Sequence, residues 1–265
     1  MGEKMLELKN VTIKFGGVTA LSEVNFHVNE GEICALIGPN GAGKTTVFNV
    51  VTGVYPVTSG EIIFQGQNLA GLKKHKVVKA GLARTFQNVR LFGDMTALEN
   101  VITASDVHKK SGLVGSLFGT PRARREESES RARAHELLEF LGIGHRADQL
   151  AKNLPYGDQR RLEIARAMGT EPKLLLLDEP AAGLGQDDID NLTKLISDLK
   201  RICTILIVEH HVDFISRISD QVYVLNFGKV IANGPFEIVK RDHAVLDAYL
   251  GTQQNTLGSD MKRVL

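Results

Sequence analysis

The sequence has no excess of charge of either sign. Of its 265 residues, 32 are basic and 31 are acidic, which gives a formal net charge of +1. A chain so balanced has no global electrostatic field that would attract nucleic acid or an anionic membrane. We therefore expect no nucleic-acid partner.

Long apolar runs are also missing. The longest aliphatic run, ICTILIV at 202–208, has seven residues, against the roughly 20 that a membrane-spanning helix requires. The N-terminal MGEKMLELKN has no apolar stretch of the length of a signal peptide. We expect the chain to reach a membrane only through a partner.

Cysteine is scarce as well, with two residues in the whole chain. Cys34 and Cys203 lie far apart in sequence, each within an apolar run typical of a strand. This favours reduced packing residues of a cytosolic protein over a disulfide or a metal site. The chain is long enough to bury the core of one large domain, or of a domain with lobes.

Glycine is concentrated in the first motif of the chain. Residues 38–46 read GPNGAGKTT and match the pattern G-x-x-x-x-G-K-[ST]. The apolar run EICALI precedes the motif, and apolar residues at helical spacing follow it. This context disfavours a chance match and predicts a loop between a strand and a helix, where backbone N–H groups and the helix dipole bind phosphates.

The motif therefore predicts a nucleoside triphosphate as the first ligand. We expect Lys44 to reach the outer phosphates and the hydroxyl of Thr45 to ligate Mg²⁺. The residues assigned to nucleotide binding here are Gly38, Pro39, Asn40, Gly41, Ala42, Gly43, Lys44, Thr45 and Thr46.

A second motif, LLLLDEP, places two carboxylates at the end of a predicted strand. Ligands gather at such strand ends in open α/β sheets. Phosphoryl transfer needs an anion that holds the metal and a base beside the attacking water. We assign these roles to Asp178 and Glu179, the alternative being a helix cap or turn, which Pro180 also fits.

The order of the predicted elements indicates an α/β fold with lobes. Short strands separated by turn glycines are predicted at 6–15, 24–28 and 61–64. We expect the strand that precedes the glycine-rich loop to lie in this partly antiparallel region. From Lys173 the chain alternates strand, helix (187–199) and strand, which is typical of a mostly parallel sheet flanked by helices.

Between these parts the sequence becomes helical. PRARREESESRARAHELLEFLG predicts a charged helix that ends at Gly142, and its apolar stripe consists of Ala134, Leu137, Leu138 and Leu141. Charges alternate between Arg122 and Arg133, which favours a solvated face over a binding patch. We expect a core with a β lobe at 1–86 and 160–251, a helical lobe at about 88–159, and a loosely held tail at 252–265.

A third motif, LPYGDQRRLEIARAM at 154–168, joins the other two in a characteristic order. The glycine-rich loop, LPYGDQ, LLLLDEP and a histidine after a strand at 205–210 follow one another as in the ATP-binding subunits of ABC transporters. The chain resembles that family over about residues 6–251. The resemblance implies a P-loop NTPase (RecA-like) core, with ATP and Mg²⁺ as cofactors.

The resemblance also implies roles for single residues. Phe15 is similar to the aromatic residue that stacks on adenine, with Ala20 beside it, and Gln87 to a glutamine that touches Mg²⁺ and the attacking water. Glu179 corresponds to the catalytic carboxylate and His210 to a histidine at the γ-phosphate, although a lone histidine at a strand end is otherwise more often structural. Metal ligation is implied for Thr45, Gln87 and Asp178.

The partners that the resemblance implies are proteins. In this family Tyr156, Gly157 and Asp158 would cover the ATP of a second ATPase subunit, in a homodimer or a heterodimer with a paralogue. The surface around 87–99, with apolar residues that could equally be core, would dock on integral membrane permease subunits. A periplasmic substrate-binding protein would act indirectly, and the chain would lie at the cytoplasmic face of the inner membrane.

The sequence departs from the common L-S-G-G-Q signature at Pro155, Tyr156 and Asp158, and from the usual Asp or Asn at Gly185. Within the family it is most similar to the larger ATPase of branched-chain amino-acid importers, and several segments carry this similarity. They are TFQNVRLF, YGDQRRLEIARAM, EPAAGL, ISDQVYVLN, AYLG and SGLVGSLFGTPRARREE. Open alternatives are a urea or amide importer, a lipopolysaccharide-export ATPase, a non-hydrolysing regulatory subunit, and a soluble ABC protein of translation or DNA repair.

Overall fold

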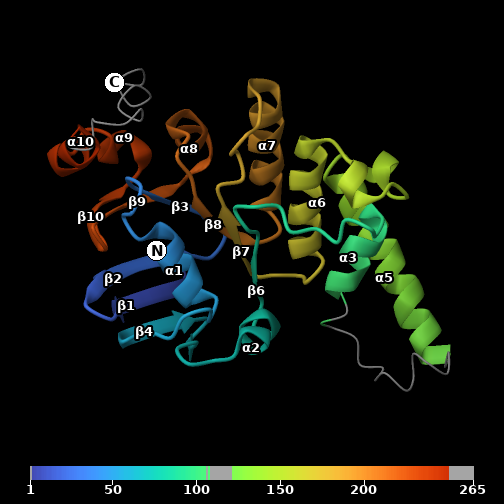
Figure 1. Cartoon of the computed structure of the whole chain (residues 1–265), viewed down its shortest axis with the longest axis horizontal. Coiled ribbons are helices and arrows are strands. Elements are labelled where there is room, and N and C mark those ends of the chain that lie inside the picture. The colour runs from blue at the N-terminus through green and yellow to red at the C-terminus, as the bar shows by residue number, and fades with distance from the viewer. Residues whose placement is uncertain (1, 106, 108–120, 251–265) are drawn as a thin grey trace. The chain divides into compact units, whose positions relative to one another are not determined.

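The computed structural model describes residues 2–105, 107 and 121–250. They form two compact units, Met1–Arg84 with Lys173–Leu265, and Thr85–Pro172 (Figure 1). The helical unit thus extends beyond the expected boundary at residue 159, because the helix that contains this residue packs on the other helices of that unit. The expected tail at 252–265 and the whole segment SGLVGSLFGT lie outside the described residues.

A six-stranded sheet forms the centre of the first unit. Its strand order is β10-β9-β3-β8-β7-β6. The strands are β3 (Ile33–Ile37), β6 (Leu82–Arg84), β7 (Leu174–Asp178), β8 (Thr204–Val208), β9 (Gln221–Asn226) and β10 (Lys229–Gly234). Only β10 is antiparallel to its neighbour, so the expectation of a mostly parallel sheet is confirmed.

A separate antiparallel sheet has the order β2-β1-β4-β5. It comprises β1 (Lys4–Phe15), β2 (Val18–Asn29), β4 (Ser59–Phe64) and β5 (Gln67–Asn68). The expectation that the strand before the glycine-rich loop lies in this region is wrong, since β3 pairs in parallel with β8 and β9. Every residue of β3 is buried, as in parallel strands covered on both faces, whereas β1 and β2 also carry exposed residues.

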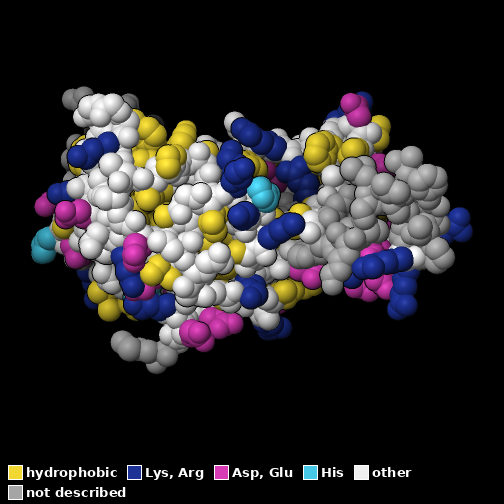
Figure 2. Space-filling model, turned by 90° about the horizontal axis from the view of Figure 1, so that it is seen from below, with side chains coloured by type: hydrophobic (Ala, Val, Ile, Leu, Met, Phe, Trp, Pro, Cys, Tyr) yellow, Lys and Arg dark blue, Asp and Glu magenta, His cyan; other side chains and the backbone are white. Residues whose placement is uncertain are grey.

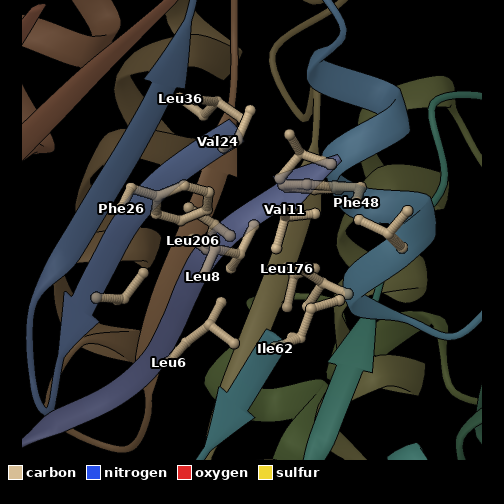
Figure 3. Packing of buried hydrophobic residues seen from close by; sticks show 14 of the residues in the cluster. Leu6, Leu8, Val11, Val24, Phe26, Leu36, Phe48, Ile62, Leu176 and Leu206 are labelled. Atoms are coloured by element: carbon tan, nitrogen blue, oxygen red, sulfur yellow. The ribbon is translucent and has the colours of Figure 1, made fainter. Parts of the chain in front are cut away.

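The main hydrophobic core joins residues of both sheets and of α1 (Lys44–Val51). Figure 3 shows side chains from these elements packed against one another. Those labelled are Leu6, Leu8, Val11, Val24, Phe26, Leu36, Phe48, Ile62, Leu176 and Leu206. The core fixes the strand that carries the glycine-rich loop against the antiparallel sheet.

Neither cysteine forms a disulfide and both are buried, which confirms their interpretation as packing residues. Burial raises the pKa of the Cys203 thiol to about 12 and that of the Cys34 thiol well above its usual range. Neither thiol is therefore ionised near neutral pH.

Helices flank the six-stranded sheet (Figure 1). They are α2 (Lys74–Lys79), α7 (Gln186–Leu199), α8 (Val212–Ile218), α9 (Phe236–Val239) and α10 (His243–Leu250). The expected helix at 187–199 corresponds to α7. Figure 2 shows basic side chains gathered near the middle of one face, with acidic and hydrophobic side chains around them, so the balanced total conceals a local concentration of positive charge.

The second unit is built from α3 (Ala97–Ser105), α5 (Pro121–Phe140) and α6 (Tyr156–Met168), with short 3₁₀ turns at Gly144–Arg146 and Ala151–Asn153. On the predicted stripe, Ala134, Leu138 and Leu141 are buried and Leu137 is half-buried. The charged face of α5 carries exposed pairs such as Arg125–Glu129, with Nε and Oε1 3.0 Å apart. This is the expected solvated face.

Candidate nucleotide site

The glycine-rich loop connects β3 to α1, as predicted. Its glycines at 38, 41 and 43 have positive φ angles of 150°, 79° and 106°. A Cβ atom at Gly38 would overlap the carbonyl oxygen of Leu225. Because only glycine adopts such a conformation without strain, the sequence permits a turn whose N–H groups can surround a phosphate.

Lys44, the first residue of α1, lies folded over this loop. Its Nζ donates hydrogen bonds to the carbonyl oxygens of Gly38 (2.6 Å) and Pro39 (2.9 Å), and the residue is only 6% exposed. Burial lowers the pKa of Lys44 to about 8, and the charges of Glu179 and Asp178 oppose that shift. The ammonium group is thus desolvated and can bind an anion strongly.

Asp178 ends β7 and is 2% exposed. Its Oδ2 accepts a hydrogen bond of 2.6 Å from Nη2 of Arg84, at the end of β6, and Nη1 of Arg84 donates to Oδ1 of Asn49 at 2.7 Å. Arg84 was not predicted from the sequence, although a single arginine at the end of a short apolar strand is a signal that could have identified it. This guanidinium holds the carboxylate in one orientation.

The predicted catalytic pair lies together. Oε1 of Glu179 and Nε2 of His210 are 2.6 Å apart, and the N–H of Glu179 donates to the carbonyl oxygen of Val208 at 2.8 Å. Glu179 follows β7 and His210 follows β8, two neighbouring parallel strands. The carboxyl ends of parallel strands meet at one sheet edge, and this explains the contact.

Phe15 ends β1 and is 45% exposed, so one ring face can receive a nucleobase. The ring of Tyr55 packs edge-on against it, with centroids 5.1 Å apart. Ala20 lies half-buried on β2. Tyr55 was not predicted from the sequence, because it follows α1 and belongs to no motif.

The residues at the position of the L-S-G-G-Q signature, which are Pro155, Tyr156, Gly157 and Asp158, lie in the second unit together with Gln87. Pro155 caps the N-terminus of α6, so the expectation that proline is compatible with the helix start is confirmed. Tyr156 is 44% exposed, Gly157 follows it on the first turn, and Oδ2 of Asp158 accepts a hydrogen bond from Nε of Arg146 at 3.3 Å.

Arg160, which the sequence analysis also missed, connects Tyr156 to the segment of Gln87. Its Nε donates to the hydroxyl of Tyr156 (3.0 Å) and its Nη2 to the carbonyl oxygen of Gln87 (2.7 Å). Glu163 beside it accepts the N–H of Phe86 at 3.1 Å. Arg160 and Glu163 are only 5% and 2% exposed. Helix α6 therefore holds the segment of Gln87 through buried polar contacts.

In the described part of the chain, no cluster of three or more His, Cys, Asp or Glu side chains is arranged to hold a metal ion. The hydroxyl of Thr45 and the carboxylate of Asp178 are nevertheless oxygen donors of the kind that Mg²⁺ prefers, and Mg²⁺ in such sites is held by few protein ligands together with the phosphates. The residues present therefore fit Mg²⁺ bound with a nucleotide. Among the helices of residues 2–105 and 121–250, none has the length and apolar character needed to cross a membrane.

The turn between β9 and β10 supports the glycine-rich loop. Gly228 has φ 73°, its N–H donates to the carbonyl oxygen of Ala42 at 2.9 Å, and its own carbonyl accepts the N–H of Ser22 at 2.8 Å. A Cβ atom here would lie 2.5 Å from the carbonyl oxygen of Ala20. A side chain at this position would therefore push the turn away from the loop.

We expect Gly228→Ala to reduce the free energy of unfolding by about 2–4 kcal/mol, since left-handed backbone strain and a steric overlap add together. Gly16→Ala is the matched control, because Gly16 also has a positive φ (57°) but a Cβ atom there would meet no other atom within 4 Å. Urea denaturation of both variants checks the difference. Equal losses in the two variants would show that the overlap at Gly228 is relieved without cost.

Together, the loop, Lys44, the two carboxylates at the end of β7 and the histidine after β8 define a P-loop nucleoside triphosphatase. Residues 21–182 match the ABC transporter family. The chain is 46% identical over 253 residues to the high-affinity branched-chain amino acid transport ATP-binding protein LivG of Escherichia coli (strain K12), covering 95% of this chain and 99% of that protein. The chain thus belongs to the ABC transporter family, as one of its ATPase subunits.

Other relatives agree with this assignment. The lipopolysaccharide export system ATP-binding protein LptB of Haemophilus influenzae is 35% identical over 250 residues, or 94% of this chain and 98% of that protein. The ADP conformation of MJ1267, an ATP-binding cassette of an ABC transporter, superposes with a TM-score of 0.82 at 32% identity, covering 94% and 99% of the two chains. A dimeric post-hydrolysis state of the cassette MJ0796 bound to ADP and Pi gives 0.74 at 27% identity, covering 88% and 99%.

Proposed function

We propose that this chain is the subunit that hydrolyses ATP to power an importer of branched-chain or other hydrophobic amino acids. The observation that carries the hydrolytic part is the contact between Glu179 and His210 at the sheet edge where Asp178 also lies. The similarity to LivG over nearly the whole chain supports the substrate class. The amino acid itself would be handled by the membrane and periplasmic partners.

In the proposed mechanism, the loop amides and Lys44 bind the β- and γ-phosphates, and Phe15 stacks on the adenine. Glu179 accepts a proton from the attacking water, while His210 orients this carboxylate and faces the γ-phosphate. Thr45, Asp178 and Gln87 would hold Mg²⁺, which when bound neutralises charge that develops on the phosphates. Arg84 keeps Asp178 in place for that role.

The proposed site is completed by a second ATPase subunit, identical or paralogous. Tyr156, Gly157 and Asp158 of one subunit would cover the nucleotide bound to the other, and hydrolysis would remove the contacts that stabilise the closed dimer. The dimeric structure of a similar cassette bound to ADP and Pi supports the dimer.

Docking on permease subunits is proposed for the segment 87–99, which would hold the chain at the cytoplasmic face of the inner membrane. The apolar residues of this segment support the proposal, since Phe92 is 49% exposed and Val89 and Leu91 are half-buried. If Phe92 were a core residue, its side chain would be buried. A periplasmic substrate-binding protein would act only through the permease.

Two alternatives rest on specific observations. The match to LptB supports a lipopolysaccharide-export system as one alternative, and a urea or amide importer rests on the sequence resemblance alone. A non-hydrolysing regulatory subunit is motivated by Pro155 and by Gly185, which caps α7. The polar pair of Glu179 and His210 opposes the regulatory alternative, because a subunit that only binds nucleotide needs no base at this position.

The proposal is tested by Mg·ATP hydrolysis over a series of protein concentrations, together with size-exclusion chromatography in ATP. We expect activity to rise faster than linearly with protein, because each site needs residues of two subunits. ATP binding without dimerisation or turnover, even with the permease present, would contradict hydrolysis. Uptake of labelled leucine by cells with and without the chain tests the substrate class, and unchanged leucine uptake would favour an alternative system.

A further inference from the structure

Glu209 is a buried carboxylate for which no role has been assigned. It lies between β8 and His210 and is 2% exposed. Its Oε1 accepts the N–H of Ala181 at 2.7 Å, and its Oε2 accepts the N–H groups of His210 at 2.7 Å and His211 at 3.2 Å. One side chain thus binds the backbone of two segments that are far apart in sequence.

These two segments carry the proposed catalytic pair. Ala181 is two residues after Glu179, and His210 directly follows Glu209. The side chains of Glu179 and His210 meet at 2.6 Å, and the N–H of Glu179 donates to the carbonyl oxygen of Val208 at 2.8 Å. Glu209 adds a second side-chain connection between the two segments. Removing the second connection would leave the geometry of the pair to their own hydrogen bond and to the backbone bond of Glu179 with Val208.

The backbone of Glu179 gives a reason for this second connection. Glu179 has φ 48°, in the left-handed region that glutamate rarely adopts. Such a conformation persists only where surrounding contacts hold it. The N–H of Ala181, fixed by Glu209, lies directly after this strained turn and can prevent it from relaxing.

We propose that Glu209 is a positioning residue for ATP hydrolysis, which holds Glu179 and His210 at the distance and orientation that the reaction needs. The inference rests on the proposed function, because it assigns Glu209 a role in the same reaction. Its side chain acts through the backbone of Ala181, His210 and His211.

The variant Glu209→Gln changes this connection at nearly constant volume. A carboxylate accepts hydrogen bonds on both oxygens, whereas a carboxamide has one acceptor oxygen and one NH₂ group that only donates. The NH₂ group would face a backbone N–H on one of the two sides. The variant therefore releases either Ala181 or the two histidine amides.

The experiment compares the wild type, Glu209→Gln, His210→Ala and the double variant in single-turnover hydrolysis of Mg·ATP, with the dissociation constant of ATP measured separately. We expect Glu209→Gln to lower the rate about tenfold or more, a part of the roughly 10²- to 10⁴-fold that general acid–base catalysis contributes. ATP affinity should stay within about twofold, since the phosphate loop is untouched, and the added effect in the His210→Ala background should fall below about twofold. Glu237→Gln, which removes an exposed carboxylate beside Lys240, is the control and should match the wild type.

An equal loss of rate in both backgrounds, or a parallel loss of rate and ATP affinity, would overturn the proposal in favour of a general structural role. If Glu209→Gln does not fold, Glu209→Asp keeps the charge but shortens the reach, and it should lower the rate while leaving ATP affinity unchanged. Hydrogen exchange at Ala181 and His210 provides a readout without hydrolysis, and unchanged protection in Glu209→Gln would overturn the proposal. A wild type that protects these amides but does not hydrolyse ATP would instead contradict the proposed function.

Discussion

Replacement of Glu179 by glutamine is expected to slow ATP hydrolysis by about 10²- to 10⁴-fold, the contribution typical of a positioned general base. A carboxamide cannot accept the proton of the attacking water. It keeps the size of the side chain and can still form a hydrogen bond with His210, whose Nε2 lies 2.6 Å from Oε1. ATP affinity should therefore stay close to that of the wild type.

The measurement is steady-state phosphate release beside equilibrium ATP binding and size-exclusion chromatography in ATP. Because the variant retains ATP, we expect it to accumulate as the closed dimer when Mg·ATP is present. Glu61→Gln, which removes an exposed carboxylate on β4, controls for the loss of one charge. Wild-type turnover by Glu179→Gln would mean that another group accepts the proton and that the assigned base is wrong.

The parts of the site that the sequence predicted are those defined by a short segment. The loop at 38–46 has its glycines, its lysine and the flanking strand and helix within one stretch of chain, so local rules suffice. Asp178, Glu179 and His210 likewise follow strands that are recognisable from apolar runs. Their meeting follows from the parallel arrangement of β7 and β8.

The residues that sequence reasoning missed depend on contacts between distant segments. Arg84 is one, since it acts by lying against Asp178, 94 positions later in the chain. Glu209 is another, because a glutamate after a strand is ordinarily a solvated residue, and only the approach of Ala181 makes it a buried acceptor. Nothing in the local sequence distinguishes such a charge from an exposed one.

Two errors about the fold have the same cause. The motif that begins at Leu154 predicted the helix α6, but the expected boundary at residue 159 divided this helix between two lobes. Its packing on α3 and α5 places the whole helix in the second unit. Similarly, the neighbours of β3 in sequence are antiparallel strands, whereas its partners β8 and β9 come from the end of the chain. Sequence order predicted the elements here better than it predicted their partners.

Lys44→Met is expected to weaken ATP binding by about 10- to 100-fold, because a charge-assisted hydrogen bond is worth about 1.5–3 kcal/mol. Methionine keeps an unbranched apolar side chain at this buried position. Since burial opposes the charged form of Lys44, the variant should be at least as stable as the wild type without nucleotide. Calorimetric titration and thermal unfolding measure the two effects, and Lys79→Met, at an exposed lysine of α2, is the control. A loss of stability equal to the loss of affinity would mean that Lys44 acts on the fold instead.

The pH dependence of binding distinguishes the charge of Lys44 from its shape. Without nucleotide its pKa is about 8, below the usual 10.5, because burial disfavours the ammonium form. The negative phosphates of ATP favour that form and so raise the pKa in the complex. Binding then takes up a proton at pH values above 8, and affinity should fall with rising pH by up to about tenfold per unit until the pKa of the complex is reached. Lys44→Met should lack this slope, and titrations in two buffers of different ionisation enthalpy measure the proton uptake directly. An equal slope in both proteins would assign the titration to another group and leave Lys44 fully charged in the free site.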